Sequence, residues 1–405
     1  MPASNDIIII GGGLVGLCAA LLMQHPQRRV TVLEAGQFAQ SASAPLNARS
    51  IALSGSSLQI FKALGLWSEI KSLAAPIRHI HISARGRWGV TRLRAAELEL
   101  EALGYVIESQ QLGQCLLKAV EASGNIEICN QASFASIEQG DKVTVAYHHQ
   151  GRLHQLEAGI ALIADGADSQ ARSALGIGQK IIDYAQSAII CNLEVGEPLV
   201  DHAYERFTEQ GPLAMLPLGG NRYACVYTLS PQKADSLLAL DDADFIEALQ
   251  ASFGFRLGYI ERVGQRFCLP LQRSRAESLA LGRCFLVGNA ANALHPVAGQ
   301  SFNLSLRDLA SLYELLAGQD LSALEPDALQ TIAGDYQDLR DKEQRAVIRL
   351  GDGLVTLFSN DLPLLGAARA AALGLLDILP PLKKQVALAG MGLSFSGNRL
   401  LRGRL

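Results

Sequence analysis

A glycine-rich turn directly after a short apolar run constrains the fold of this chain more than any other feature. The run Asp6–Ile10 is β-branched and has no polar interruption, which is typical of a central parallel strand. The turn has the spacing GxGxxG, and the residues that open the following helix are Gly11, Gly13, Leu14, Val15 and Gly16. Backbone N–H groups at such a turn can approach a pyrophosphate, and the helix N-terminus favours an anion. The alternative is an ordinary tight turn.

An acidic residue ends the second strand of the same unit. The segment Arg29–Glu34 has strand composition, so that strand, turn, helix and strand fit within about 30 residues, as a βαβ nucleotide-binding unit requires. The carboxylate of Glu34 is suited to ribose hydroxyls and repels a 2′-phosphate. The unit therefore predicts FAD or NAD rather than NADP at this turn.

Two later blocks repeat the pattern of a buried strand that ends in a polar turn. In the first, the strand Gly159–Ala164 leads into Asp165 and Gly166, which alone would be read as a turn. In the second, an apolar strand ends at Gly288 and Asn289, and a loop with Pro and Gly opens a long helix. Backbone amides at that helix start are suited to an anionic or electron-rich group.

Together, in this order and about 150 and 120 residues apart, the three blocks resemble those of the para-hydroxybenzoate-hydroxylase-type flavin monooxygenases. The resemblance implies FAD as cofactor and a fold with a Rossmann-like domain of the GR2 type. It implies further FAD contacts in the second and third blocks and at two positions between the first and second: Arg49, Gln110, Asp165, Gly288, Asn289, Pro296, Gly299, Gln300, Ser301, Phe302 and Asn303. Asn289 replaces the usual Asp, and Ser301 and Ser305 stand where the family often has Gly.

The third block, LVGNAANALHPVAGQ, and the segments from Glu205 to Pro217 and from Asp352 to Phe358 resemble the branch that hydroxylates prenylated phenols in ubiquinone biosynthesis. The resemblance is strongest to hydroxylases of 2-polyprenyl-6-methoxyphenol. It implies NADPH or NADH as a transient co-substrate, O2, and oxygen transfer from a flavin hydroperoxide. Two alternatives stay open: an FAD hydroxylase of a small soluble aromatic compound, and a non-catalytic FAD-binding scaffold of a quinone-biosynthesis complex.

The protein itself contributes few reactive side chains to such chemistry, because the flavin carries it. His295 is the catalytic candidate, as a proton relay, and the alternative is a hydrogen bond to the backbone of its own loop. The segment between 205 and 217 offers an apolar substrate wall, and its candidate residues are Phe207, Leu213, Met215 and Leu216. The alternative for these four is an ordinary core.

The order of the elements predicts an α/β fold in which the FAD-binding domain is split by an inserted, mostly antiparallel sheet. We expect the FAD-binding domain at 1–75, 98–180 and 273–345. We expect the substrate-binding sheet at 76–97 and 181–272, and a helical region at 346–405.

Charge and cysteine usage exclude several other classes. The net charge of −4 and the pI of about 6.1 leave no basic face for nucleic acid. Seven cysteines without a CxxC spacing predict neither a disulfide framework nor a zinc site, and we expect no metal. His79 and His81 alternate on a predicted strand and are expected to share a polar face.

The C-terminal region is apolar at helical spacing, but no stretch of about 20 apolar residues predicts a spanning helix. Its apolar surface could pack on the FAD-binding domain or a partner subunit, or face lipid near a polyprenyl substrate. We expect a cytoplasmic protein without a signal peptide, with peripheral contact to the inner membrane left open. A homo-oligomer and other quinone-biosynthesis proteins also stay open as partners.

Overall fold

The computed structural model describes residues 5–37, 45–86, 90–293, 300–358, 380–393 and 400–402. A parallel sheet forms the centre of the FAD-binding domain, with its strands in the order β19-β11-β1-β2-β8. These strands are Cys284–Leu286, Arg152–Ile163, Asn5–Ile10, Val30–Glu34 and Ile126–Asn130. Ile7, Ile8 and Ile9 of the central strand are fully buried, because helices or loops cover both faces of the sheet.

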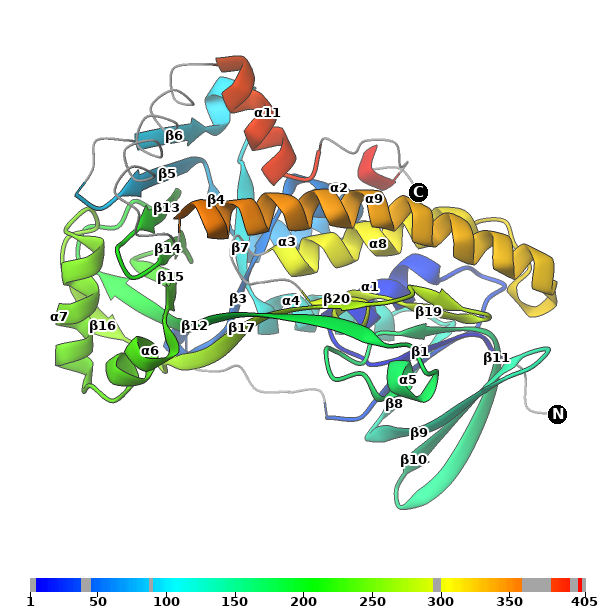
Figure 1. Cartoon of the computed structure of the whole chain (residues 1–405). Helices are drawn as coiled ribbons and strands as arrows, with labels where there is room; N and C mark the ends of the chain where they lie inside the picture. The colour runs from blue at the N-terminus through cyan, green and yellow to red at the C-terminus, as the bar shows by residue number, and fades with distance from the viewer. Residues whose placement is uncertain are drawn as a thin grey trace.

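Three helices pack into the same core as this sheet: α1 (Leu14–Met23), α4 (Ser109–Glu121) and α8 (Gln300–Leu316). Two antiparallel strands, β9 (Ala132–Gln139) and β10 (Val143–His149), extend the sheet from the long strand β11. They form an arm that projects from the domain (Figure 1).

The second half of the molecule is a larger, mostly antiparallel sheet, in the order β20-β17-β12-β15-β14-β13-β5-β6. Its strands are Asn292–Ala293, Phe267–Ala276, Gln179–Val195, Arg222–Leu229, Pro212–Pro217, His202–Phe207, His79–Ala84 and Val90–Arg94. A further strand, β16 (Ile260–Val263), pairs with β12. The helices α6 (Pro231–Leu238) and α7 (Asp242–Phe253) cover one face, where a second core forms around Phe245 and Phe253.

This combination of a parallel FAD-domain sheet with an antiparallel second sheet confirms the predicted α/β fold class. The segment at 79–94 joins the second sheet through the parallel pairing of β5 with β13, although more than 100 residues separate them in the chain. The boundaries that we expected at 180/181 and 272/273 fall inside β12 and β17. β12 begins and β17 ends beside the first core, and the pair continues past a bulge between Asp183 and Ser187 into the second sheet.

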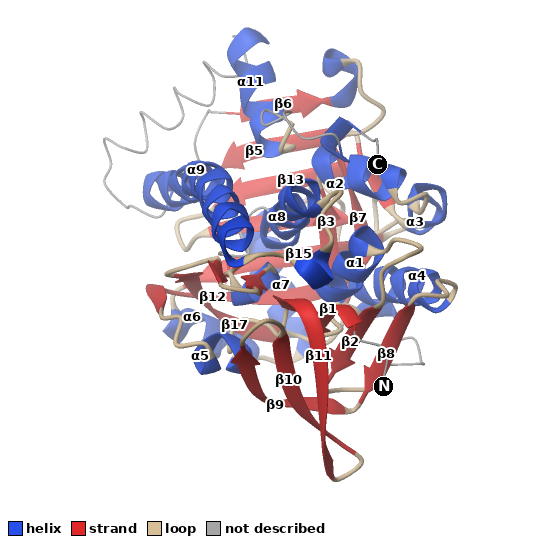
Figure 2. Ribbon diagram, turned by 90° about the vertical axis from the view of Figure 1, so that its right-hand side faces the viewer, coloured by secondary structure: helices blue, strands red, loops and turns tan. Residues whose placement is uncertain are grey.

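Two long helices, α8 and α9 (Pro326–Phe358), lie side by side across the middle of the molecule, above the first sheet in the view of Figure 1. The longer, α9, packs on α8 and runs toward the second sheet. A small sheet of β3 (Ser50–Leu53), β7 (Gly104–Glu108) and β4 (Ala75–Ile77) lies between the two large sheets, next to α2 (Gly55–Ala63) and α3 (Trp67–Leu73). Figure 2 shows α8 and α9 in front of the strands of the second sheet.

The C-terminal part of the chain contributes α11 (Pro380–Gly390), which lies beside β6 (Figure 1). Ala387 and Met391 pack there against Leu93, Ala95 and Leu103. Among the described residues, no helix combines the length and the apolar character needed to span a bilayer.

Candidate functional site

The glycine-rich turn after β1 is built so tightly that two of its glycines admit no side chain. Gly11 has φ +104°, and a Cβ there would stand 2.5 Å from the carbonyl oxygen of Ala164. A Cβ at Gly16 would stand 1.9 Å from the carbonyl oxygen of Gly11. A Cβ at Gly13, in contrast, would meet no atom within 4 Å. The start of α1 therefore faces open space, where its first N–H groups have no helical partner.

The carboxylate of Glu34 is fixed against this turn. The backbone N–H of Gly12 donates to its Oε2 at 2.7 Å, and the N–H of Gly36 donates to its Oε1 at 2.7 Å. Each carboxylate oxygen can accept more than one hydrogen bond, so ribose hydroxyls can still bind there.

The second block lies directly beside the first. Ala164 donates its N–H to the carbonyl of Ile10, and the next residue is Asp165. The N–H of Ala171 donates to Oδ2 of Asp165 at 3.1 Å, whereas Oδ1 is buried without a partner among the described residues. A buried carboxylate oxygen that lacks a partner is costly, so it indicates a hydrogen-bond donor from a ligand.

The third block, around Gly288, contacts both the glycine-rich turn after β1 and the segment that follows Asp165. Gly288, at φ +65°, packs on Val15, because a Cβ there would stand 3.1 Å from Val15 Cγ1. The buried guanidinium of Arg172 donates to the carbonyls of Ala167 and Ala290, at 3.1 and 3.0 Å. The two glycine-rich corners, far apart in the chain, therefore share one edge of the sheet.

The first turn of α8 makes contacts of two kinds. Ser301 Oγ donates to Asn289 Oδ1 at 3.0 Å, and Gln300 donates to the carbonyl of Gly390. Phe302 packs on the core of the first domain. Asn303 is 1% exposed, so the contact with FAD that we expected of it cannot come from its side chain.

The amide of Asn303 is used inside the protein instead. Its oxygen accepts from the N–H of Ser54 at 2.8 Å and from Ser57 Oγ at 2.7 Å, and its nitrogen donates to the carbonyl of Ala52. These bonds hold α8 against β3 and α2. The other predicted residues of this block, His295, Pro296 and Gly299, lie outside the described residues.

Arg49 and Gln110 are brought together at the junction with the second sheet. The N–H of Ser109, which precedes Gln110, donates to the carbonyl of Arg49 at 2.7 Å. The exposed guanidinium of Arg49 lies over the ring of Phe267, 4.9 Å from its centroid. This cation–π contact connects the FAD-binding domain to the first residue of β17.

The predicted substrate wall needs a correction. Leu213 and Met215 are fully buried in the core beneath α7, so neither side chain can line a site that is open to substrate. Leu216 points to the opposite face of β14, because side chains alternate along a strand. Phe207 is half-buried and shares that opposite face, since it is two residues from Glu205 and four from Ala203.

The opposite face presents a half-exposed row of side chains across six strands. Residues that pair directly across neighbouring strands point to the same face of a sheet. The residues of this row are Ile82, Glu205, Ala214, Val226, Ile190 and Phe267. We call this set the sheet row. It begins on β5 and ends at the ring that carries Arg49, so it faces the FAD-binding domain. The sequence pattern suggested a wall on β14, but the pairing of distant strands was needed to identify its members.

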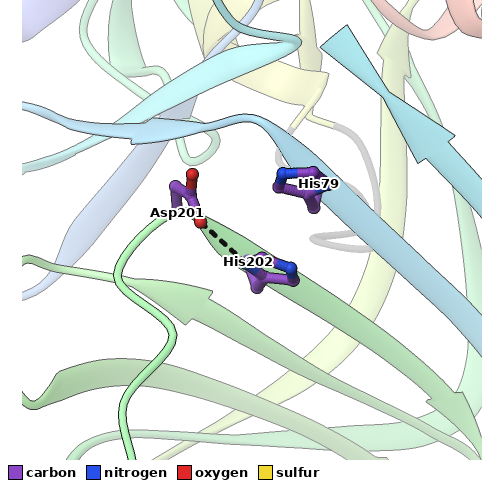
Figure 3. A group of neighbouring side chains, drawn as sticks. All are labelled: His79, Asp201 and His202. Carbon is purple, nitrogen blue, oxygen red and sulfur yellow. Dashed lines mark hydrogen bonds and ion pairs between the residues drawn. The ribbon is translucent and has the colours of Figure 1, made fainter. Parts of the chain in front are cut away.

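A cluster of polar side chains lies on the other face, at the start of β13 (Figure 3). The rings of His79 and His202 stack with centroids 4.2 Å apart, and His202 Nδ1 lies 2.7 Å from Asp201 Oδ1. One ligand atom from each residue lies within 4.8 Å of the others, a spacing that a metal ion could bridge. Arg78, 3.7 Å from Asp201, already competes for the carboxylate.

The cavity beside this cluster is strongly cationic. Its volume is about 560 Å³, and its lining includes Arg92, Arg94 and Arg256. Burial, and then the charges of Arg256 and Arg92, lower the pKa of His81 to about 4. Repulsion from these guanidinium groups opposes a divalent cation, so we assign no metal to the cluster.

The comparisons with known proteins agree with this geometry. The family model described as the FAD binding domain matches residues 4–348. The chain belongs to this family of FAD-dependent monooxygenases. It is 31% identical to the ubiquinone hydroxylase UbiL of Rhodospirillum rubrum, over 98% of this chain and 92% of that protein. It is 30% identical to the 3-demethoxyubiquinol 3-hydroxylase of Escherichia coli, over 96% of this chain and 99% of that protein.

A solved structure shares the fold at much lower identity. The p-nitrophenol 4-monooxygenase PnpA of Pseudomonas putida superposes with a TM-score of 0.80 at 18% identity, and covers 98% of this chain and 99% of that chain. The three corners around Gly11, Asp165 and Gly288 fit the FAD that the family binds. They combine an open helix start, an acid for the ribose and an unpartnered buried carboxylate oxygen.

Proposed function

We propose that this protein is an FAD-dependent monooxygenase that hydroxylates a prenylated phenol in ubiquinone biosynthesis, with NADPH or NADH and O2 as co-substrates. The observation that carries the proposal is the similarity, over nearly the whole chain, to two hydroxylases named for ubiquinone and demethoxyubiquinol. The meeting of three FAD-type blocks at one sheet edge supports it independently.

In this proposal the chain's own residues bind and orient the cofactor. The open N-terminus of α1 at Gly13 takes the pyrophosphate, and Glu34 accepts from the ribose hydroxyls. Asp165 uses its free Oδ1, and Asn289 and the first turn of α8 reach the ribityl side. When bound and reduced, FAD would supply the activated oxygen that an electron-rich ring accepts.

The sheet row offers the substrate an apolar surface next to the cofactor. Four strand spacings of about 4.8 Å give it a length of about 19 Å from β13 to β17, enough for an aromatic ring and the first prenyl units. The rest of a polyprenyl chain needs an apolar environment, and we infer a peripheral contact with the inner membrane. A cavity of about 360 Å³ beside α11, lined by Leu93, Leu98 and Ala387 together with Lys383 and Lys384, supports such a contact.

The direct test is product analysis with purified protein, FAD, NADPH and 18O2. We expect 2-farnesyl-6-methoxyphenol, a short soluble form of the substrate class, to gain one labelled oxygen atom and to be required for rapid NADPH oxidation. Equal turnover of phenols without a prenyl chain would favour a hydroxylase of small aromatics. Bound FAD that no nicotinamide reduces, with substrate present, would contradict an enzymatic role and favour the scaffold.

A further inference from the structure

Glu205 is the one ionisable side chain of the sheet row. Its direct neighbours across the strands are Ile82 on β5 and Ala214 on β14, and its neighbours on the same face of β13 are Ala203 and Phe207. Within the described part of the chain, its carboxylate has no hydrogen-bond donor and no ion-pair partner. A carboxylate in such apolar surroundings costs stability, and an apolar side chain or glutamine would fit the sheet at lower cost.

The surroundings also change how this group titrates. Burial raises the pKa of Glu205 to about 7, and no charged group among the described residues contributes to the shift. The titratable neighbours of Glu205 on β13 and β5, Arg206 and His81, project to the other face of the sheet. A carboxyl group with a pKa near 7 is half ionised near neutral pH, where it can take up and return a proton.

We propose that Glu205 is a catalytic residue that accepts the proton of the phenolic hydroxyl when the substrate lies along the sheet row. This inference rests on the proposed function. The phenolic O–H bond breaks, its electron pair stays on the oxygen, and a carboxylic O–H bond forms. The ring carbons ortho and para to the oxygen become more nucleophilic toward the activated oxygen that FAD and O2 supply. After oxygen transfer, the ring carbon releases its hydrogen as a proton to water, the C–H electron pair restores the aromatic ring, and Glu205 returns its own proton to the phenolic oxygen.

The test is the Glu205→Gln variant, which keeps the size of the side chain and removes the base. With 2-farnesyl-6-methoxyphenol, FAD and NADPH, we expect kcat for hydroxylated product to fall by about 100-fold, a typical contribution of a general base, with KM and FAD content unchanged. The kcat of the wild type should rise with pH through about 7, and the variant should lose this rise. The matched control is Glu261→Gln on β16, an exposed carboxylate of the same sheet domain.

A substrate that ionises without help separates a base from a merely structural residue. We expect the deficit of the variant to shrink at least tenfold with an analogue of the same phenol that carries fluorine on the two ring carbons that do not react, because the fluorines bring the pKa of its hydroxyl much closer to neutral. A structural defect would persist with both substrates.

Stability gives a further check with a defined sign. Because the folded protein raises the pKa of Glu205 above the ordinary value of 4.5, the stability linked to its protonation is present below 4.5 and is lost as the pH rises through about 7. Glu205→Gln should therefore unfold at a higher temperature than the wild type at pH 8, and at nearly the same temperature at pH 4.5.

The two proposals fail differently. A wild type that binds FAD but adds no oxygen to the prenylated phenol would contradict the proposed function. A wild type that hydroxylates it, with a Glu205→Gln variant of equal kcat and the same pH profile, would overturn only the role of Glu205.

Discussion

Gly11 and Gly13 stand two residues apart in the same turn, yet they are glycines for different reasons. At Gly11 the backbone is left-handed and the carbonyl of Ala164 fills the space of a side chain, so the fold itself requires glycine. At Gly13 no protein atom occupies that space. The room at Gly13 is therefore explained by a ligand rather than by packing.

This difference gives a prediction at the scale of one methyl group. Gly13→Ala should raise the dissociation constant of FAD at least tenfold, because the Cβ occupies the path of the pyrophosphate, while the melting temperature of the FAD-free protein stays unchanged. Fluorescence titration and calorimetry measure the two quantities. Gly124→Ala, which also meets no atom within 4 Å, is the control and should change neither. Wild-type affinity in Gly13→Ala would contradict the predicted position of the cofactor.

Single residues were predictable where a local pattern determines them. Gly11, Glu34 and Gly288 follow from the strand–turn–helix pattern, and the structure brings them to one edge. The internal role of Asn303 was not predictable, because its partners come from residues about 250 positions away. Glu205 was part of a motif, but its isolation depends on which strands flank β13, and no local pattern encodes that pairing.

At the scale of elements, α8 and α9 are joined by a buried ionic network. Arg340 forms ion pairs with Asp308 and Glu343, and Glu343 also pairs with Arg307. All four side chains are nearly inaccessible to solvent. Burial alone would raise the pKa of Glu343, but the charges of Arg340 and Arg307 lower it overall. The network fixes the helix whose first turn belongs to the FAD site.

Removing one member of this network should be costly. Arg340→Met leaves two buried carboxylates with one cation, and we expect it to lower the free energy of unfolding by about 3–5 kcal/mol. The control on the same helix is Arg345→Met, whose exposed pair with Asp341 should be worth about 0–1 kcal/mol. Urea denaturation measures both. Equal effects of the two substitutions would contradict a structural role for the buried network.

The elements themselves were largely predictable from periodicity and turn residues. The strands expected at Asp6–Ile10 and Arg29–Glu34 are β1 at Asn5–Ile10 and β2 at Val30–Glu34. The expected domain boundaries at 180/181 and 272/273 fall inside β12 and β17, because composition changes gradually along these two strands. A strand that leaves one core and enters another keeps the same β-rich composition throughout.

For the whole molecule, these two strands predict a single unfolding event. Ala276 on β17 is part of the first core, while Leu193 on β12 is part of the second, so neither core can lose its strands alone. We expect thermal loss of FAD-domain structure, followed by flavin fluorescence, to coincide with loss of β-sheet circular dichroism. Two separated transitions would show that the halves unfold independently.

The ladder between β12 and β17, which has paired residues on both sides of a bulge at Asp183–Ser187, also limits how the enzyme can work. A protein with flexible linkers between its lobes can open like a clamshell to admit a reactant, but here such a hinge would have to tear backbone hydrogen bonds that join both halves. Substrate must therefore enter, and product must leave, while the two halves keep their relative position. Evolution of new specificities on this scaffold would then proceed by changing the side chains of the sheet row rather than by altering domain motion.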